Sequence, residues 1–238
     1  MTKVGKTVLI AGVILVGAIG FIIWDKLYRV QAQPAWIAAD PHDTYFYGSV
    51  GARHTGGVPY WLWLAMPRIF PEHMPGLGGY ASVGMSWEEG KEMPVGFAKQ
   101  RVGYIRVTGN CALCHVVSQS NGPDRAPSIV AALPGRTTDI TPLLTFWKAC
   151  AADSRFNADE FFSEIDSDTK LSLLDRLLYR YVFIPRTKRM LMNNPEQALL
   201  SPELREHLRN PHSEAPFADR QMKLLREHFT EQSQTATH

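Results

Sequence analysis

Residues Asn110–His115 read NCALCH and contain the pattern C-x-x-C-H, with Cys111 and Cys114 in one helical turn and His115 directly after them. This spacing presents two thiols to the two vinyl groups on one porphyrin edge and then brings an imidazole to the iron. The pattern predicts one covalently attached haem c, bound by Cys111, Cys114 and His115, with His115 as the metal ligand. The predicted fold is mainly α, a cytochrome c-like helical haem domain.

A bare C-x-x-C has other uses, either as a redox dithiol or as half of a zinc site. The adjacent His115 favours haem, and the sequence has no second C-x-x-C to complete a zinc site. No βαβ pattern surrounds the motif, as a thioredoxin-like dithiol would require. Asn110 or Thr108 is expected to cap the turn of the motif. The third cysteine, Cys150, falls on the apolar face of a predicted helix and is expected to be a small buried hydrophobic residue.

The bulk composition is that of an ordinary folded chain. Of 238 residues, 45% are hydrophobic and 20% are charged, which excludes a disordered, collagen-like or polytopic membrane protein. The formal net charge is only +2, so the composition gives no reason to expect a nucleic-acid partner.

The N-terminal stretch Val8–Trp24 reads VLIAGVILVGAIGFIIW and has no charged residue. At about 1.5 Å per residue it nearly crosses a hydrocarbon core of about 30 Å. We expect residues 1–30 to be a retained transmembrane anchor, with residues 8–24 in the lipid bilayer. The alternative is a signal peptide cleaved after Val30–Ala32. Both interpretations place the bulk of the chain outside the cytoplasm, and the anchor predicts a single-pass protein of the inner (cytoplasmic) membrane with its main part in the periplasm.

Beyond the anchor, residues 31–44 are predicted to be a linker, residues 45–200 a c-type haem domain, and residues 201–238 a helical C-terminal tail. Within the haem domain, Tyr45–Phe97 is dense in glycine, proline and aromatic residues, which signal turns rather than a helical period. We expect this long segment to be irregular and to be held by aromatic packing. A short strand is expected at Val102–Val107.

The sequence that follows the motif is predicted to be helical. A helix is expected over Thr141–Ala151, because a hydroxyl residue and a proline form a typical helix start. Asn157 resembles the cap of a second helix. Apolar residues at helical spacing predict another helix over Lys170–Phe183, which Pro185 is expected to end. Two helices are expected in the tail, over Ser201–His207 and Ala218–Glu231.

The second axial ligand of the iron decides the chemistry, and several residues are candidates. A methionine gives a high-potential electron carrier, a histidine lowers the potential, and an open position permits O₂ or peroxide chemistry. Met190 and Met192 are the leading candidates because they follow a predicted helix well beyond His115. Met74, Met93, His42, His54 and His73 are the others. Arg101, Arg106, Arg125 and Arg136 are candidates to pair with the haem propionates.

Five short motifs together resemble a known family: YGSVG (47–51), PYWLW (59–63), PGLGGYAS (75–82), PVGF (94–97) and NCALCH (110–115). The later segments DSRFN (153–157) and YRYVFIP (179–185) fit the same resemblance. The chain is similar over 45–191 to the N-terminal half of a group of bacterial multihaem cytochromes. That group is related to the di-haem cytochrome c peroxidases and includes the haem-dependent rubber oxygenases. The resemblance implies that the haem on Cys111, Cys114 and His115 has an open sixth position. The relatives carry a second C-x-x-C-H, whereas this sequence has one, so peroxidase chemistry that needs an electron-donating second haem is in doubt.

The function expected first is one-electron transfer by a membrane-anchored periplasmic monohaem cytochrome c, with no catalytic residues, acting on a redox partner protein or membrane complex. A haem-dependent oxygenase or peroxidase with an open iron is the alternative. A second alternative is a haem-bearing accessory subunit of a membrane electron-transfer complex.

Overall fold

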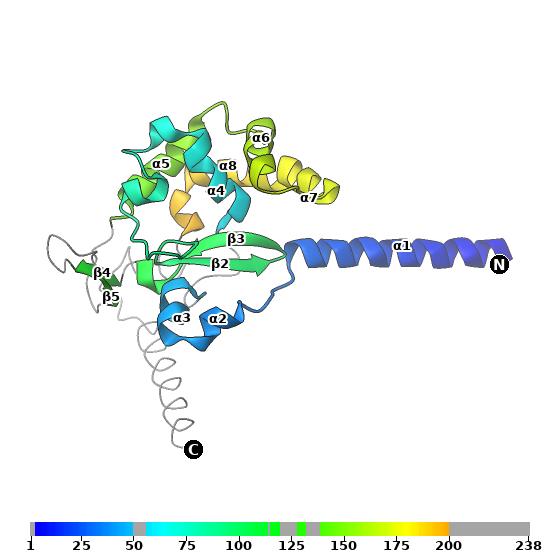
Figure 1. Ribbon diagram of the computed structural model, residues 1–238. Coiled ribbons are helices and arrows are strands. Elements are labelled where there is room, and N and C mark those ends of the chain that lie inside the picture. Colours follow the sequence, from blue (N-terminus) through cyan, green and yellow to red (C-terminus); the bar gives the residue numbers. More distant parts are fainter. Residues whose placement is uncertain (1–2, 50–55, 114, 120–127, 132–138, 200–238) are drawn as a thin grey trace, which may run out of the picture. The chain divides into compact units, whose positions relative to one another are not determined.

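The computed structural model describes residues 3–49, 56–113, 115–119, 128–131 and 139–199. The chain divides into two compact units, Met1–Leu200 and Ser201–His238. The second unit lies outside the described residues, and so do both helices expected in the tail. The described part is mainly helical, as predicted, with a small antiparallel sheet beside the helices (Figure 1).

The N-terminal helix α1 (Lys3–Leu27) is long and apolar, as the sequence predicts. Its segment Leu9–Leu27 has a mean hydropathy of 2.0, and none of that segment is buried inside the protein. A helix of this length and composition is able to cross a membrane. Such an N-terminal helix could be a membrane anchor or a signal sequence.

A three-stranded antiparallel sheet follows, formed by β1 (Val58–Pro59), β2 (Phe97–Val102) and β3 (Tyr104–Gly109) in the order β1-β3-β2. The strand expected at Val102–Val107 is wrong in its bounds, because a turn at Gly103 divides that stretch between β2 and β3. Gly103 has φ +72°, and a Cβ there would lie 2.4 Å from the Lys26 carbonyl oxygen at the end of α1. Only glycine fits this close approach of two backbones.

The segment predicted to be a linker contains α2 (Ala35–Ala39) and the start of α3 (Pro41–Tyr47). Asp40 caps α3, since its side chain accepts a hydrogen bond from the backbone N–H of His42 at 2.8 Å. The proline that follows the cap suits the first helical turn.

The prediction that Tyr45–Phe97 is irregular is wrong for α4 (Tyr60–Ile69). Its buried residues recur at helical spacing, but Pro67 inside the helix and the surrounding prolines and glycines hide that period in the sequence. The segment also contains the end of α3 and the strand β1, and beyond α4 its described residues are irregular apart from short 3₁₀ turns, η1 (Pro71–His73) and η2 (Gly79–Val83).

The stretch after the motif is not helical at first. It forms a two-stranded antiparallel ribbon of β4 (Val116–Gln119) and β5 (Ser128–Ala131), which corrects the expectation of helix throughout. Helix α5 (Thr141–Ala152) then agrees with the predicted helix start and end. Cys150 is fully buried on the inner face of this helix, as expected, and burial raises the pKa of its thiol.

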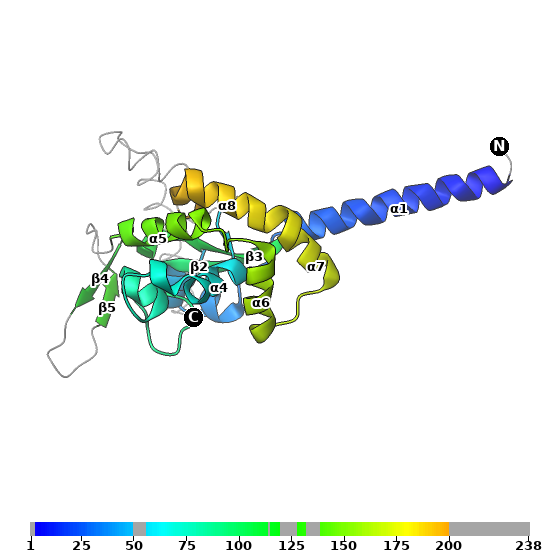
Figure 2. The ribbon, with the colours of Figure 1, turned by 90° about the horizontal axis from the view of Figure 1, so that it is seen from above.

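The helix α6 (Ala158–Asp168) begins at the predicted cap, where Asn157 Oδ1 accepts from the backbone N–H groups of Asp159 at 3.0 Å and Glu160 at 3.2 Å. Next come α7 (Leu173–Leu178), a π-helical segment (Tyr179–Phe183) and α8 (Ile184–Asn193), which lies beside α5 (Figure 2). The last described turn is η5 (Pro195–Ala198).

The expectation that Pro185 ends the helix is wrong, because the chain stays helical into α8. Proline lacks an N–H, and in a regular α-helix its ring meets the carbonyl four residues earlier. The π-helical turn before it is wider, and its last bond runs from the N–H of Ile184 to the carbonyl of Tyr179. This turn shifts the carbonyls ahead of Pro185, so the helix continues through the proline.

Candidate haem-attachment site

The C-x-x-C-H motif begins as a tight turn directly after β3. Cys111–Leu113 form a single 3₁₀ turn, η3. The Oδ1 atom of Asn110 accepts a hydrogen bond from the N–H of Ala112 at 2.9 Å, which confirms the predicted cap. The N–H of His115 donates to the carbonyl oxygen of Ala112 at 3.2 Å, so the turn extends to the histidine.

Asn110 also fastens this turn to the end of α3. Its Nδ2 group donates to the carbonyl oxygens of Phe46 at 3.2 Å and Gly48 at 2.9 Å. The residue is only 3% exposed, so its amide is shielded from solvent at this point. One buried side chain therefore both caps the motif and joins it to a helix more than sixty positions earlier in the chain.

The residue just before β2 also supports the turn. Gly96, which precedes β2, has φ +87°, and a Cβ there would lie 2.4 Å from Cα of Leu113. The backbone N–H of Gly96 donates to the Phe46 carbonyl oxygen at 3.0 Å, and its carbonyl oxygen accepts from the N–H of Asn110 at 2.9 Å. The glycine of the PVGF motif is thus required by the close approach of the C-x-x-C-H turn.

His115 is half-buried and its Nδ1 atom is buried, so the accessible surface of the residue lies on other atoms. The hydroxyl of Tyr45, from α3, donates to the His115 carbonyl oxygen at 3.3 Å. Cys111 is likewise half-buried, and Cys114 lies outside the described residues. The turn is thus held by its Asn110 cap, by the close contact with Gly96 and by the hydrogen bond at the His115 carbonyl. The side chains of Cys111 and His115 remain partly accessible, and this arrangement fits the attachment of a haem edge.

The candidates for the sixth ligand lie in different parts of the fold. Met190 is half-buried on α8, and Met192 on the same helix is 44% exposed. His42 pairs with Asp43 and Glu88. Met93 is buried, Met74 is half-buried, and His54 lies outside the described residues.

The candidate propionate arginines are also dispersed. Arg106 is buried, and its guanidinium donates to the carbonyl oxygens of Val102 at 2.9 Å and Gly56 at 3.1 Å. Arg101 is exposed on β2. Arg125 and Arg136 lie outside the described residues.

The sequence patterns did not reveal a cluster of polar groups around His73. The Nε2 atom of His73 lies 3.2 Å from Asp153 Oδ2, and Glu72 completes a set of three groups with the chemistry of metal ligands. The guanidinium of Arg155 contacts both carboxylates and donates to the Ile69 carbonyl oxygen at 3.0 Å. This cation offsets the negative charge, so we interpret the cluster as an ion-pair network between η1 and the end of α5.

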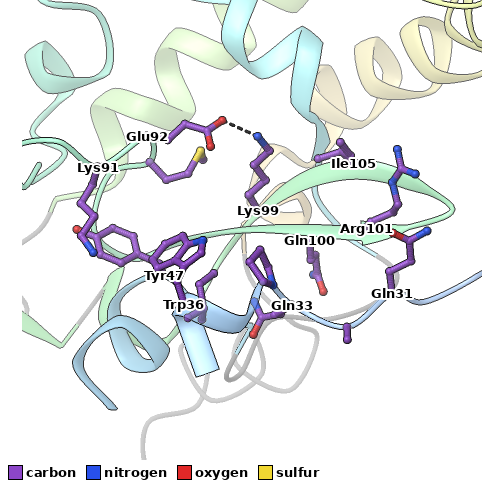
Figure 3. Close-up of a pocket in the computed structure, with 14 residues that line it drawn as sticks. Gln31, Gln33, Trp36, Tyr47, Lys91, Glu92, Lys99, Gln100, Arg101 and Ile105 are labelled. Carbon is purple, nitrogen blue, oxygen red and sulfur yellow. Dashed lines mark hydrogen bonds and ion pairs between the residues drawn. The ribbon is translucent and has the colours of Figure 1, made fainter. Parts of the chain in front are cut away.

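A cavity of about 270 Å³ between β2 and the residues that follow α1 also has no signal in the sequence (Figure 3). Lys91 lies over the rings of Trp36 at 4.9 Å and Tyr47 at 5.1 Å, and its Nζ atom pairs with Asp43 at 2.7 Å. Burial raises the pKa of the Asp43 carboxyl, but its hydrogen bonds from Lys91 and His42 outweigh this and leave the pKa below its ordinary value. Tyr47 belongs to α3, the helix that also contacts the motif.

Comparisons of the chain with models of known protein families, with curated proteins and with solved structures found no match. The function is therefore inferred from the residues of this chain alone.

Proposed function

We propose that the protein is a membrane-anchored periplasmic cytochrome c that carries one covalent haem and transfers single electrons. The observation that carries this proposal is the C-x-x-C-H turn, which Asn110 caps and against which Gly96 packs closely. The single apolar helix at the N-terminus supports the membrane location, and haem attachment to such a motif belongs to the outer face of a bacterial membrane.

Attachment needs no oxidant. Each thiol adds across one vinyl C=C bond, so an S–C bond forms at one vinyl carbon and the thiol hydrogen goes to the other. Cys111 and Cys114 supply the two sulfur atoms, and His115 supplies the axial nitrogen. The bound haem then provides an iron that cycles between the ferrous and ferric states.

The chain's own residues hold the motif and set the surroundings of the iron. Asn110, Phe46 and Gly96 join the turn to α3 and to the start of β2 through buried hydrogen bonds, which hold the backbone from which the motif begins. With haem bound, a motif held in this way would favour electron transfer, because His115 would move little when the iron changes charge.

Electron transfer is favoured over catalysis because the sequence has one C-x-x-C-H, and one iron passes one electron at a time. The resemblance to oxygenases and peroxidases keeps the open-site enzyme as the alternative function. The accessory-subunit function differs only in its partner, and co-purification with a membrane complex would distinguish it.

Expression of the full chain with a cytochrome c maturation system tests the proposal. We expect the intact mass to exceed that of the bare chain by one haem, and the haem to survive acid–acetone extraction. Cys111→Ala should lose the double linkage, whereas Cys150→Ala, at the buried third cysteine, should retain it. A parent chain that stays at the mass of the bare polypeptide would refute covalent haem.

A further inference from the structure

The segment from α7 into the π-helical turn bears large apolar side chains on a buried side and on an exposed side, beside the charged residues Asp175, Arg176 and Arg180. Tyr179 and Phe183 are buried and face the sheet, where the Phe183 ring lies 4.0 Å from the ring of Tyr104. The opposite side bears five large apolar residues that are 36–77% exposed, which we name the α7 apolar face: Leu173, Leu174, Leu177, Tyr181 and Val182. A group of large apolar side chains exposed together on one short segment is typical of a surface that contacts another apolar medium.

This face lies beside the end of the apolar helix α1. The Nζ atom of Lys26, in the last turn of α1, pairs with Asp175 Oδ1 of α7 at 2.9 Å. The turn at Gly103 meets the backbone of Leu27, and the next residue, Tyr104, contacts Phe183. Figures 1 and 2 both show α7 next to the point where α1 ends.

The side chains around the face suit a lipid interface. Trp24 and Tyr28, at the end of α1, are 49% and 65% exposed, and both residue types prefer the headgroup level. The charged groups on the same segment are paired, Arg176 with Asp166 at 2.7 Å and Arg180 with Asp159 at 2.5 Å. Paired charges lose less solvation free energy than single ones when a helix approaches lipid.

We propose that the α7 apolar face inserts into the headgroup and acyl boundary of the same bilayer that α1 crosses. The inference rests on α1 remaining as a membrane anchor. A phospholipid surface is the occupant because the Lys26–Asp175 pair places the face at the end of the span, where lipid is the adjacent medium. Two contacts with one bilayer, a crossing helix and an interfacial helix, hold the periplasmic domain in a fixed orientation.

Depth-dependent quenching in vesicles tests this proposal on the full chain. A fluorescent label is attached to Leu177→Cys on the face, to Leu15→Cys in the middle of α1, and to Leu77→Cys, an exposed leucine with 102% relative exposure in the segment before η2. The chain without an added cysteine gives the background labelling of its own thiols, of which Cys111 is half-buried and Cys150 is buried. The vesicles contain phosphatidylcholine and phosphatidylglycerol, with a nitroxide quencher at either a shallow or a deep acyl position.

We expect the label at position 177 to lose about half of its emission to the shallow quencher, as an interfacial helix at a depth of roughly 5–10 Å would. The label at position 15 should respond to the deep quencher, and the label at position 77 should respond to neither. Quenching of the label at position 15 but not of the label at position 177 would refute insertion of the α7 apolar face, while the membrane anchor would stand. A blue-shifted but unquenched label at 177 would show that protein covers the face and would also overturn it. Absence of quenching at 15 would remove the anchor and the inference together.

Discussion

The hydroxyl of Tyr80 donates a hydrogen bond of 2.7 Å to the carbonyl oxygen of Trp63, and the two rings stack at 4.2 Å with an interplanar angle of 10°. In a regular α-helix the Trp63 carbonyl would accept from the N–H of the residue four positions later. That residue is Pro67, which has no N–H. Tyr80 thus supplies the hydrogen bond that the proline removes from α4, and burial raises the pKa of Tyr80 and keeps its proton in place.

This relationship predicts a specific coupling between positions 80 and 67. Tyr80→Phe keeps the stacked ring but leaves a buried carbonyl without its donor, so the free energy of unfolding should fall by about 1–3 kcal/mol. In a Pro67→Ala background, the new N–H reaches the Trp63 carbonyl, and Tyr80→Phe should cost less. Denaturant unfolding of the four proteins measures the coupling. Equal losses in both backgrounds would contradict the role given to Tyr80.

The pairing of Tyr80 with Trp63 explains why α4 was not predicted from the sequence. The helical period of Tyr60–Ile69 is interrupted by a proline, and the residue that compensates for it lies 17 positions from Trp63, beyond the reach of any local pattern. The π-helical turn before Pro185 is a second case, because the shifted carbonyls depend on the backbone and not on a residue type. By contrast, Asn157 and Asn110 mark a helix start and a turn start through their own side chains, and those predictions are confirmed. Helix α5 does begin at Thr141, but the predicted hydroxyl cap is wrong, because Asp139 accepts the hydrogen bond from the Thr141 N–H at 2.8 Å.

The candidate site was predictable only where its contacts are local in the sequence. The C-x-x-C-H pattern is contiguous, so its turn and its cap follow from the sequence. The contacts that hold the motif turn in place come from Phe46 and Gly96, which are more distant in the chain. In the sequence, these positions stand out only as an aromatic residue and a glycine. The cavity between β2 and the segment after α1 depends wholly on tertiary packing.

A second prediction concerns the close contact between Gly96 and the motif turn. Gly96→Ala introduces two penalties, since the residue has φ +87° and its Cβ would meet Leu113 Cα at 2.4 Å. Gly90 has φ +76°, and a Cβ there would meet no atom within 4 Å, so Gly90→Ala bears the backbone penalty alone. We expect Gly90→Ala to lower the free energy of unfolding by about 1–2 kcal/mol, and Gly96→Ala to lower it by a further 1–3 kcal/mol, roughly the cost of overpacking.

Haem incorporation gives that comparison its functional readout. Gly96→Ala should reduce the fraction of chains that carry haem after maturation, because the displaced turn bears the two thiols, whereas Gly90→Ala should leave the fraction unchanged. The mass spectrum of each purified variant measures it. Equal incorporation in the two variants would show that the turn does not depend on this close contact.

The ion pair between α1 and α7 predicts an acid-dependent loss of stability. Burial raises the pKa of the Asp175 carboxyl, but the hydrogen bonds from Ser172 and Lys26 outweigh it and leave the pKa below its ordinary value of 3.8. A depressed folded-state pKa contributes stability that is present above the unfolded pKa and is lost as pH falls through the folded pKa. The difference in unfolding free energy between the parent and Asp175→Asn should therefore be constant near neutral pH and shrink below pH 3.8.

Denaturant unfolding at several pH values measures that difference. Asp159→Asn is the matched control, since the Asp159 side chain is 81% exposed in its pair with Arg180 and such a surface pair contributes little. A difference for Asp175→Asn that grew on acidification would contradict the direction of the pKa shift.

The last prediction concerns the sixth position of the proposed haem. If electron transfer is the function, the reduced iron is six-coordinate, and the parent protein should bind carbon monoxide slowly. Of the two leading candidates on α8, Met190 is half-buried and Met192 is 44% exposed, and a more buried thioether is better shielded from competing water. We therefore expect Met190→Ala to open the site, lower the reduction potential and speed carbon monoxide binding, while Met192→Ala, two positions away, changes neither. Stopped-flow mixing with carbon monoxide and potentiometric titration measure the two effects. Rapid stoichiometric binding by the unmodified reduced protein would exclude a methionine ligand altogether, and it would favour the oxygenase-like function with an open iron.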